Sequence, residues 1–522
     1  MCSIAETRKS FVNANREFFR RRVENTKPID GIILVDPQST SEFFLTEVMK
    51  IAAALRDVMR KELVVINAIR ADSAARAIVN SYMPGVVVNI AKLMLTGLVC
   101  RGFRVIRVAA KLSTGSGLVA HNEGKYEIGS CIYDTLLRRM GLASISRLTL
   151  KQRLYVLMEL AYFYGLLRYV ERHAVNFVVL PDNAYRNGLL FEIARVKALP
   201  SIVGIDLNGM SMHRYATAGD YNYYCRTPDE KIVQHVTDSP ILLNRAEEYI
   251  RLRTTGQEKQ HDVMRAYSAA DMLSKAELMQ EYGLDPARKT VLVMAHIFCD
   301  APHAYPGMLF KDFEEWLVST CARLSQNGRV NFVVKEHPSA ALYGEEGLTA
   351  RTLEKNGIRD KVLNRQVNTK SLFHSIDVMI TCGGTSGMEF PCFGVPVLVA
   401  ARPPYCHEKF IRCPSTGGEY LSELDRIHQY EKHDEEDCRR AMAVLYVIQS
   451  VMKVPRDGIG LGTHDYYLGS QIDMADFFKE MVDDCRSGAG YSSLVSAVSR
   501  FIQGPYANFV DDNKIKPSPM PN

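Results

Sequence analysis

Residues 377–400 read DVMITCGGTSGMEFPCFGVPVLVA and hold a complete strand–turn–helix–strand pattern. The apolar run at 378–381 predicts a short buried strand, and Gly383 and Gly384 predict a tight turn that leaves no Cβ in the way of a ligand. A helix is expected over about 385–393, followed directly by a second apolar strand. Because two strands joined through a helix form a parallel βαβ unit, this stretch predicts an α/β fold.

The turn also has the residue types of a phosphate site. Thr385 and Ser386 can cap the helix, where unpaired N–H groups and the helix dipole favour an anion. Glu389 follows one turn later on the same edge of the helix and is expected to reach ribose hydroxyls. An ordinary βαβ unit with a structural glycine turn has the same residues, so the turn alone leaves both interpretations open.

The alternation of short apolar strands and helices extends through the chain. Strands are expected in the first half at 31–36, 62–67, 103–109, 176–182 and 201–207, and in the second half at 290–296, 330–337, 377–381 and 395–400. Strands separated by helices indicate parallel sheets covered on both faces. The expected fold class is therefore α/β, with two doubly wound Rossmann-like domains that face each other across a ligand cleft.

Composition divides the chain into five parts. The middle of the chain is polar and helical without a strong strand, which is typical of a connector. The expected parts are a basic N-terminal helical segment (1–29), a first Rossmann-like domain (30–215), a helical connector or insertion (216–288), a second Rossmann-like domain (289–485), and a C-terminal helix with a disordered tail (486–522).

Bulk composition describes an ordinary globular protein. The chain has 522 residues, of which 47% are apolar and 24% charged, and its net charge of +5 is weak for this length, which argues against nucleic acid as a partner. The most apolar window, residues 86–100, is interrupted by Asn89 and Lys92 and is too short to span a bilayer. Twelve cysteines without a secretory signal predict reduced thiols and a cytoplasmic location.

The N-terminal segment mixes several arginines with Phe11, Phe18 and Phe19. As a helix, it could lie peripherally on an anionic membrane face, or it could pack its phenylalanines on the body of the protein. The sequence leaves both arrangements open.

Polar clusters follow three strands of the second half, and the carboxyl ends of parallel strands meet at one edge of a sheet. The clusters are His296, Asp300 and His303 after the first strand, Lys335, His337 and Ser339 after the second, and the 383–389 turn after the third. Cations, hydroxyls and helix N–H groups around one point are what a phosphate-bearing donor requires. Because His337 precedes a proline, its backbone is held extended, and its ring is expected to stabilise a leaving phosphate.

The first of these clusters also has a spacing that would suit a metal on one face of a helix. Pro302 and Pro306 interrupt such a helix. We therefore expect no metal at His296, Asp300 and His303.

In the first half, three carboxylates follow strands or lie on a polar loop. A transferase that acts on a hydroxyl needs a group to take its proton, and Asp36, Glu123 and Asp182 are the candidates for this base. Each could instead be a helix cap or a turn residue, and Asp36 before Pro37 has the pattern of a turn.

Two motifs in the second half carry a family resemblance. KEHPSA (335–340) followed by GGTSGMEFPCFGVPVLVAARPPY (383–405) resembles the paired donor-site signatures of bacterial capsule and surface-polysaccharide glycosyltransferases. In that family an HP motif precedes a GTxGxE-type motif in a GT-B fold. YEIGSCIYDTLLRR (126–139) resembles the family's acceptor-half segment.

The resemblance implies transfer of a sugar from a nucleotide-sugar, which would be a substrate, with no cofactor and no metal. In related CMP-Kdo and CMP-sialic acid transferases the motif residues hold the donor phosphate, and those roles would fall on His337, Thr385 and Ser386. The chain departs from the family pattern at Glu336 and Cys382. Lys335 and Arg402 could supply the charge that is missing at position 382.

The implied acceptor is a surface glycan or a lipid-linked glycan, reached from the cytoplasmic membrane face. Two other functions fit the same sequence. One is a sugar-nucleotide epimerase of the same fold, and the other is an inactive glycan- or nucleotide-binding partner of a polysaccharide assembly complex.

Overall fold

The structure is a computed structural model that describes residues 3–24, 28–37, 42–67, 73–204, 211–215, 227–257, 261–268, 271–304, 306–455 and 474–517. The chain forms two compact units. Unit 1 comprises residues 1–133, 147–225 and 452–511, and unit 2 comprises residues 134–146, 226–451 and 512–522.

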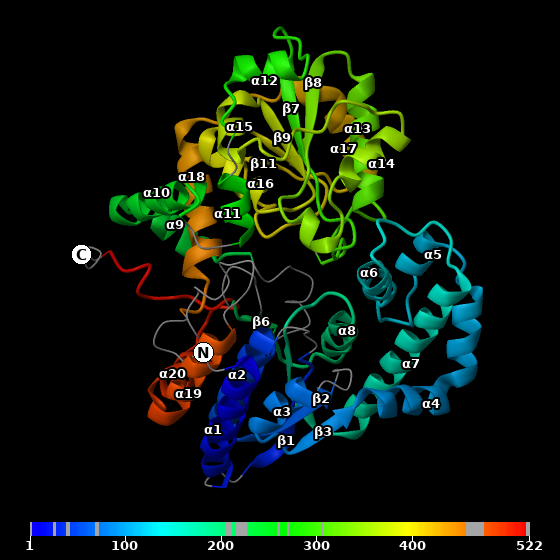
Figure 1. The fold of residues 1–522 in the computed structure, drawn as a ribbon, viewed down its shortest axis with the longest axis vertical. Coiled ribbons are helices and arrows are strands. Elements are labelled where there is room, and N and C mark those ends of the chain that lie inside the picture. Colours follow the sequence, from blue (N-terminus) through cyan, green and yellow to red (C-terminus); the bar gives the residue numbers. More distant parts are fainter. Residues whose placement is uncertain are drawn as a thin grey trace. The chain divides into compact units, whose positions relative to one another are not determined.

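Unit 1 contains a six-stranded sheet in the order β3-β2-β1-β4-β5-β6 (Figure 1). Its strands are β1 (Ile29–Val35), β2 (Lys61–Asn67), β3 (Val86–Asn89), β4 (Val175–Leu180), β5 (Ser201–Val203) and β6 (His213–Tyr215). The first five strands are parallel, and β6 runs antiparallel to β5. The direction of winding reverses between β1 and β4, which is the place where doubly wound sheets bind ligands.

Helices complete unit 1. They are α1 (Ile4–Glu24), α2 (Glu42–Met59), α3 (Ser73–Ser81), α4 (Ile90–Lys111), α5 (Gly115–Val119), α7 (Leu150–Arg172), α8 (Asn187–Lys197), α19 (Met474–Ser487) and α20 (Ala489–Gln503), while α6 (Gly129–Met140) begins in unit 1 and ends in unit 2. Apolar faces of α1, α2, α19 and α20 close over one side of the sheet as a single core. Segments from both ends of the chain therefore stabilise the same unit.

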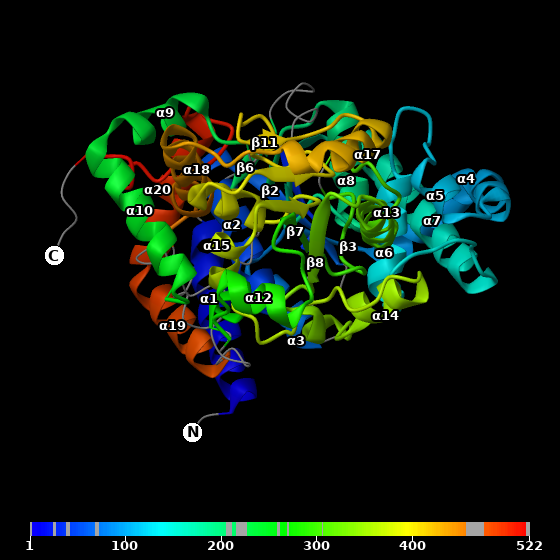
Figure 2. The same cartoon turned by 90° about the horizontal axis from the view of Figure 1, so that it is seen from above.

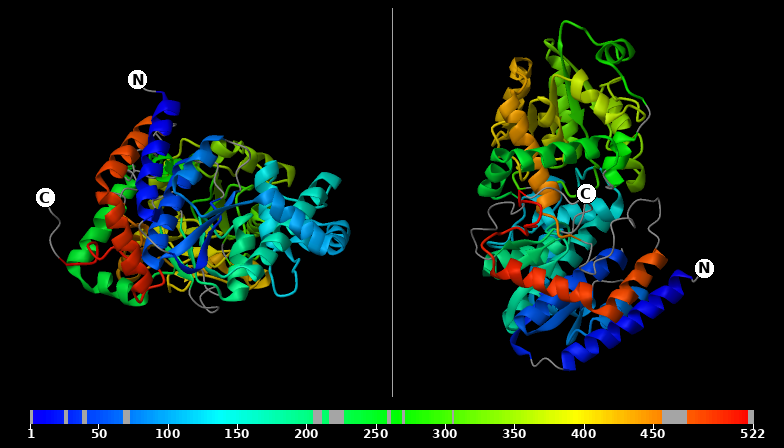
Figure 3. Two further views of the ribbon diagram at one scale, coloured as in Figure 1. Left: turned by 90° about the horizontal axis from the view of Figure 1, so that it is seen from below. Right: turned by 90° about the vertical axis from the view of Figure 1, so that its left-hand side faces the viewer.

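Helix α1 packs its phenylalanines on the body of the protein. Phe11 and Phe19 are fully buried, and the Phe11 and Phe478 rings stack with centroids 5.4 Å apart. Figure 3 shows α1 in blue beside the orange C-terminal helix α19, its main helical contact. Of the two arrangements left open by the sequence, the structure has the packed one.

The prediction of a strand at 103–109 is wrong, because these residues belong to α4. Their valines and isoleucine gave a β-branched pattern, but the buried residues of α4 are Leu93, Gly97, Val105 and Ala109, spaced in fours as on a helix. The third strand of the sheet is instead β3, which the sequence did not reveal.

Unit 2 contains a five-stranded parallel sheet in the order β11-β10-β9-β7-β8. Its strands are β7 (Lys289–Met294), β8 (Val330–Lys335), β9 (Val378–Thr381), β10 (Val397–Val399) and β11 (Ile411–Arg412). The three strands β7, β8 and β9 are short runs rich in β-branched residues and are mostly buried, as a parallel sheet between two helical layers requires. The predicted α/β class, with two doubly wound parallel-rich sheets, is confirmed.

The helices of unit 2 are α9 (Glu230–Asp238), α10 (Pro240–Thr254), α11 (His261–Tyr267), α12 (Lys275–Glu281), α13 (Phe313–Gln326), α14 (Leu348–Lys355), α15 (Thr369–Ser375), α16 (Ser386–Glu389), α17 (Gly417–Arg426) and α18 (Glu435–Tyr446). Short 3₁₀ turns occupy Ala340–Tyr343, Phe390–Phe393 and Ile427–Gln429, and a π turn occupies Val447–Val451. Figure 2 shows α9, α10 and α18 packed together on one flank.

The two units do not follow the predicted boundaries. The described residues of the expected connector belong to unit 2 from residue 227, and residues 452–511 return to unit 1. The tail predicted to be disordered is placed as far as residue 517, since Arg245 Nη1 donates to the carbonyls of Lys514 and Lys516 at 3.2 and 3.0 Å. Among the described residues, no helix is both long and apolar enough to cross a membrane.

Candidate functional site

The carboxyl ends of β7, β8 and β9 lie side by side in unit 2. The sheet order β8-β7-β9 makes them neighbours, and all three strands run in the same direction. The winding reverses between β7 and β9, which marks this edge as the ligand-binding edge of a doubly wound sheet. The three polar clusters singled out in the sequence therefore begin at the same edge of this sheet.

His296, directly after β7, joins the end of β7 to the end of β9. Its Nε2 lies 3.0 Å from Thr381 Oγ1 and accepts the backbone N–H of Cys382 at 3.2 Å. Burial, with a smaller electrostatic effect of the nearby His337, lowers the pKa of His296 to about 3, so the His296 ring is neutral. Since Nε2 accepts, we assign the proton to Nδ1, and stacking on Phe313 at 4.4 Å fixes the ring.

His337 follows β8, and its tautomer is set by the local backbone. The Ser339 N–H donates to His337 Nδ1 at 3.2 Å. A neutral imidazole that accepts at Nδ1 carries its proton on Nε2, so the donor of the His337 ring is Nε2–H. Ser339 itself is buried, and its backbone N–H fixes the orientation of the His337 ring.

Lys335 is the last residue of β8 and is buried beneath this edge. Its Nζ donates to the carbonyl of Val367 at 2.6 Å. Burial lowers the pKa of Lys335 to about 8. The ammonium form therefore still predominates at pH 7, as a phosphate site needs.

Glu336 departs from the family pattern for a structural reason. Its carboxylate accepts the N–H groups of Gly347 at 3.1 Å and Thr349 at 3.3 Å, at the start of α14. A carboxylate at a helix N-terminus satisfies donors that the helix leaves open and interacts well with its dipole. Glu336 thus holds α14 beside the end of β8.

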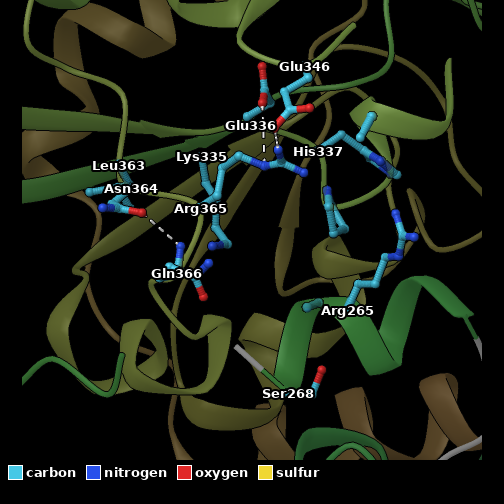
Figure 4. A pocket seen from close by; sticks show the side chains of 13 residues that line it. Arg265, Ser268, Lys335, Glu336, His337, Glu346, Leu363, Asn364, Arg365 and Gln366 are labelled. Atoms are coloured by element: carbon cyan, nitrogen blue, oxygen red, sulfur yellow. Dashed lines mark hydrogen bonds and ion pairs between the residues drawn. The ribbon is translucent and has the colours of Figure 1, made fainter. Parts of the chain in front are cut away.

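Lys335, Glu336 and His337, at the end of β8, line a pocket of about 760 Å³ in unit 2, drawn in Figure 4. Its other walls come from residues 265–268 at the end of α11 and from residues 363–366, which supply amides from Asn364 and Gln366. The Arg365 guanidinium lies between the carboxylates of Glu346 and Glu336. The volume suits a ligand of nucleotide size, and the lining provides both donors and acceptors.

The 383–386 turn has the predicted position but not the predicted caps. Gly383 and Gly384 have no positive φ, and α16 has only four residues. Thr385 itself has helical backbone angles and makes no side-chain cap bond, so the expected anion site at a long helix N-terminus is not built. The turn is held by Tyr405 Oη, which donates to the Gly384 carbonyl at 2.6 Å. Thr385 and Ser386 are half-buried beside the end of β9.

Glu389 does not have the predicted position on an open helix edge. It is buried, and its two carboxylate oxygens accept hydrogen bonds from Arg253 Nε and Tyr267 Oη, each at 2.6 Å. Arg253 comes from α10, a helix far away in the sequence. The structure therefore contradicts the predicted contact of Glu389 with ribose hydroxyls, because its carboxylate is used in a structural ion pair.

His303 pairs with Asp134, a residue that the sequence did not single out. Nδ1 of the His303 ring lies 2.7 Å from Asp134 Oδ1, and the backbone N–H of His303 donates to Asp134 Oδ2 at 3.2 Å. Burial opposes charge on His303, but the neighbouring carboxylate outweighs it and raises the pKa of His303. Burial raises the pKa of Asp134, whose partner is 169 residues away, a separation that gives no signal in sequence.

Asp300 lies near this pair, where its charge raises the pKa of Asp134 further. No cluster of three or more His, Cys, Asp or Glu residues with the arrangement of a metal site occurs in the described part of the chain.

Arg402 is exposed and packs its side-chain carbons on Gly307, while Cys382 is fully buried in the core of unit 2.

Asp36 and Asp182 lie at the ends of β1 and β4, where the winding of the unit 1 sheet reverses. Asp36 is fully buried and accepts from Tyr162 Oη at 3.0 Å. A fully enclosed carboxylate suits a structural role, so the structure argues against the prediction that Asp36 is the base. Asp182 is half-buried, and its Oδ1 accepts the N–H groups of Asn183 and Ala184 at 2.7 and 3.1 Å in a turn.

Glu123 is surrounded by donors. Arg104 Nε lies 2.6 Å from Oε2, His121 Nε2 lies 2.9 Å from Oε1, and Tyr164 Oη also bonds to Oε2. Burial acts to raise the pKa of Glu123, but these hydrogen bonds outweigh it and lower the pKa to about 2. A carboxylate with this pKa is a poor proton acceptor near pH 7, which argues against Glu123 as the base.

No protein-family model and no curated protein matches the chain. Among solved structures, it is similar to two Thermosulfurimonas dismutans KpsC structures. The beta Kdo 2,4 transferase has 14% identity and a TM-score of 0.31, over 52% of this chain and 80% of that one. The beta Kdo 2,7 transferase has 15% identity and a TM-score of 0.33, over 61% and 88%.

The Neisseria meningitidis UDP-GlcNAc 2-epimerase is also similar, with 9% identity and a TM-score of 0.23, over 81% of this chain and 97% of that one. TM-scores of this size assign no fold family.

Proposed function

We propose that this chain is a GT-B glycosyltransferase that transfers a sugar from a nucleotide-sugar donor to a surface-polysaccharide or capsule glycan. One observation carries the proposal. The HP motif at His337 and the glycine turn at 383–386, which resemble the donor signatures of that family, follow β8 and β9, the two strands that flank β7 at the carboxyl edge of one doubly wound sheet. Unit 2 would bind the donor, and a CMP-sugar such as CMP-Kdo is favoured by the same motifs.

The roles in donor binding follow from the contacts. The Nε2–H of His337 and the ammonium of Lys335 would face the donor phosphate, with the hydroxyls of Thr385 and Ser386 beside it. Neutral His296 would hold the ends of β7 and β9 at the distance that the donor requires. This chemistry stabilises the leaving phosphate through donors and a cation and calls for no metal ion.

Asp182 is the remaining candidate for the base in unit 1. It lies at the end of β4 where the winding reverses and is half-buried rather than enclosed. Asp182→Asn keeps a side-chain oxygen for the turn and removes the carboxylate. We expect this variant to bind nucleotide normally and to lose turnover, whereas Glu123→Gln should keep turnover.

The donor is tested by the thermal shift of the full chain with CMP, UDP, GDP and CDP, since a ligand that binds the native state raises the apparent melting temperature. We expect the largest shift with CMP. His337→Ala should reduce it, and His407→Ala, which removes an exposed histidine of the same unit, should not. No shift with any nucleotide would overturn the proposal.

Turnover separates the proposed transferase from the two other functions. Incubation with UDP-sugars alone, followed by analysis for epimers, detects an epimerase. Nucleotide binding without donor consumption in the presence of glycan acceptors would identify an inactive binding partner. Retention of transfer in EDTA tests the metal-independent mechanism.

A further inference from the structure

Helices α4 and α7 of unit 1 form a tightly packed antiparallel pair. A Cβ added at Gly97 would lie 1.9 Å from the carbonyl of Ala161, and one added at Gly165 would lie 2.0 Å from that of Leu93. Near the other end of the pair, Arg153 Nη1 donates to the carbonyl of Ala110 at 3.2 Å. The two helices lie side by side in Figures 1 and 2.

Large apolar side chains cover the outside of this pair. On α4, Val99 is 79% exposed and Phe103 82% exposed, and Leu95 and Ile106 are also exposed. On α7, Leu150, Leu154 and Met158 are exposed at a spacing of four residues, which places them on one face. Because the helices are antiparallel, these α7 residues accompany the second half of α4. Contiguous exposure of this kind marks an interaction surface.

The charge around the apolar residues has one sign. Residues 90–122 contain no aspartate or glutamate but five cations, which are Lys92, Arg101, Arg104, Arg107 and Lys111. Residues 147–158 likewise lack carboxylates and contain Arg147, Lys151 and Arg153. Of these, Arg104 forms an ion pair with Glu123, while Lys92, Arg107 and Lys111 are exposed.

We infer that the α4–α7 surface, defined by the exposed apolar and basic residues just named, docks on an anionic lipid surface. Apolar side chains enter the boundary between headgroups and acyl chains, and cations beside them attract anionic headgroups. A second copy of this chain on the same surface would bring exposed cations against exposed cations, since the carboxylate of Glu123 is buried and already paired with Arg104. A nucleic acid would offer phosphates but leave the apolar residues uncovered. The lipid contact needs no donor nucleotide, so it is independent of the proposed transfer activity.

Vesicle co-sedimentation of the full chain tests this inference. We expect binding to vesicles with one-third phosphatidylglycerol and little binding to pure phosphatidylcholine, and weaker binding as salt rises. Val99→Ser with Phe103→Ser should lower partitioning by about tenfold, because two large apolar side chains no longer enter the lipid. Arg107→Glu with Lys111→Glu should lower it at least as much and remove most of the salt dependence.

Two controls keep the test specific. Leu342→Ser with Lys9→Glu removes an exposed apolar residue and an exposed cation elsewhere and should bind like the wild type. Melting temperature and nucleotide binding show that each variant is folded. In addition, the fluorescence emission of Phe103→Trp should shift to shorter wavelength when anionic vesicles are added, and brominated lipid should quench it. Trp316 is fully buried, so its emission should stay constant in both measurements.

Absence of wild-type binding to anionic vesicles, or equal binding by the Val99→Ser/Phe103→Ser protein, would overturn the inference. So would a dimer in sedimentation velocity that the same two substitutions abolish, because the surface would then serve a second copy of the chain.

Discussion

Arg253 and Glu389 form a buried ion pair, with Arg253 Nε 2.6 Å from Glu389 Oε1 and both side chains almost inaccessible to solvent. The pair ties α10 to the short helix α16 after the glycine turn. Glu389 belongs to the motif that gives the chain its family resemblance, yet its contacts in unit 2 are structural. The position of the 383–386 turn therefore depends on a helix from a remote part of the sequence.

Removal of one member of this pair should destabilise unit 2. Glu389→Leu leaves the Arg253 charge buried without its counterion, and such a change costs about 3–5 kcal/mol. We expect a clear fall in the melting temperature and a partial recovery in Arg253→Leu/Glu389→Leu, where no charge remains. An unchanged melting temperature with lost nucleotide binding would restore the ribose-contact role for Glu389.

Nucleotide affinity should fall as pH rises through about 8. Burial lowers the pKa of Lys335 to about 8 in the free protein, and an anionic phosphate binds the ammonium form more tightly than the neutral amine. The affinity should therefore be greatest below pH 8 and decrease between pH 8 and 10. Isothermal titration of the wild type and of Lys335→Met tests this, and the variant should bind weakly without this pH dependence. An identical slope in both proteins would exclude Lys335 from the phosphate site.

Acid should weaken unit 1 through Glu123. The hydrogen bonds from His121, Tyr164 and Arg104 outweigh burial and lower the pKa of Glu123 from 4.5 to about 2. A depressed carboxyl pKa contributes stability above pH 4.5 that is lost as pH falls toward 2. We expect Glu123→Gln to be less stable by on the order of 2 kcal/mol at pH 6. Melting curves should show this difference shrink at pH 3, and a constant difference would contradict the assignment.

The α4–α7 crossing should tolerate no side chain at Gly97. A Cβ there would lie 1.9 Å from the carbonyl of Ala161, which is backbone and cannot move aside like the end of a side chain. Gly97→Ala should destabilise unit 1 by about 1–3 kcal/mol, measured by urea denaturation. Gly102→Ala is the matched control in the same helix, because no atom beyond the neighbouring residues and backbone of the helix itself lies within 4 Å of its Cβ position. It should be neutral or stabilising by up to about 1 kcal/mol.

Local sequence determined the central strands of both sheets and the edge on which the candidate site lies, but not β3, β6 or β11. Strands such as 290–296 and 330–337 were recognised because a parallel strand buried on both faces is a continuous apolar run, whatever lies around it. Residues at strand ends, such as His296 and His337, could be grouped because parallel strands bring their carboxyl ends to one edge. The prediction of a strand at 103–109 is wrong because β-branched residues also occur in packed helices. In α4, packing against α7 outweighs their preference for strands.

Only the tertiary structure decided what each polar side chain contacts. Glu389 meets Arg253, Asp134 meets His303 and Asp36 meets Tyr162 across separations of 136, 169 and 126 residues. Hydrogen bonds and ion pairs of this kind depend on the packing of whole helices, which no local pattern encodes. The same reason explains the α4–α7 surface. The sequence contains its apolar and basic residues, but packing at Gly97 and Gly165 determines which of them stay outside.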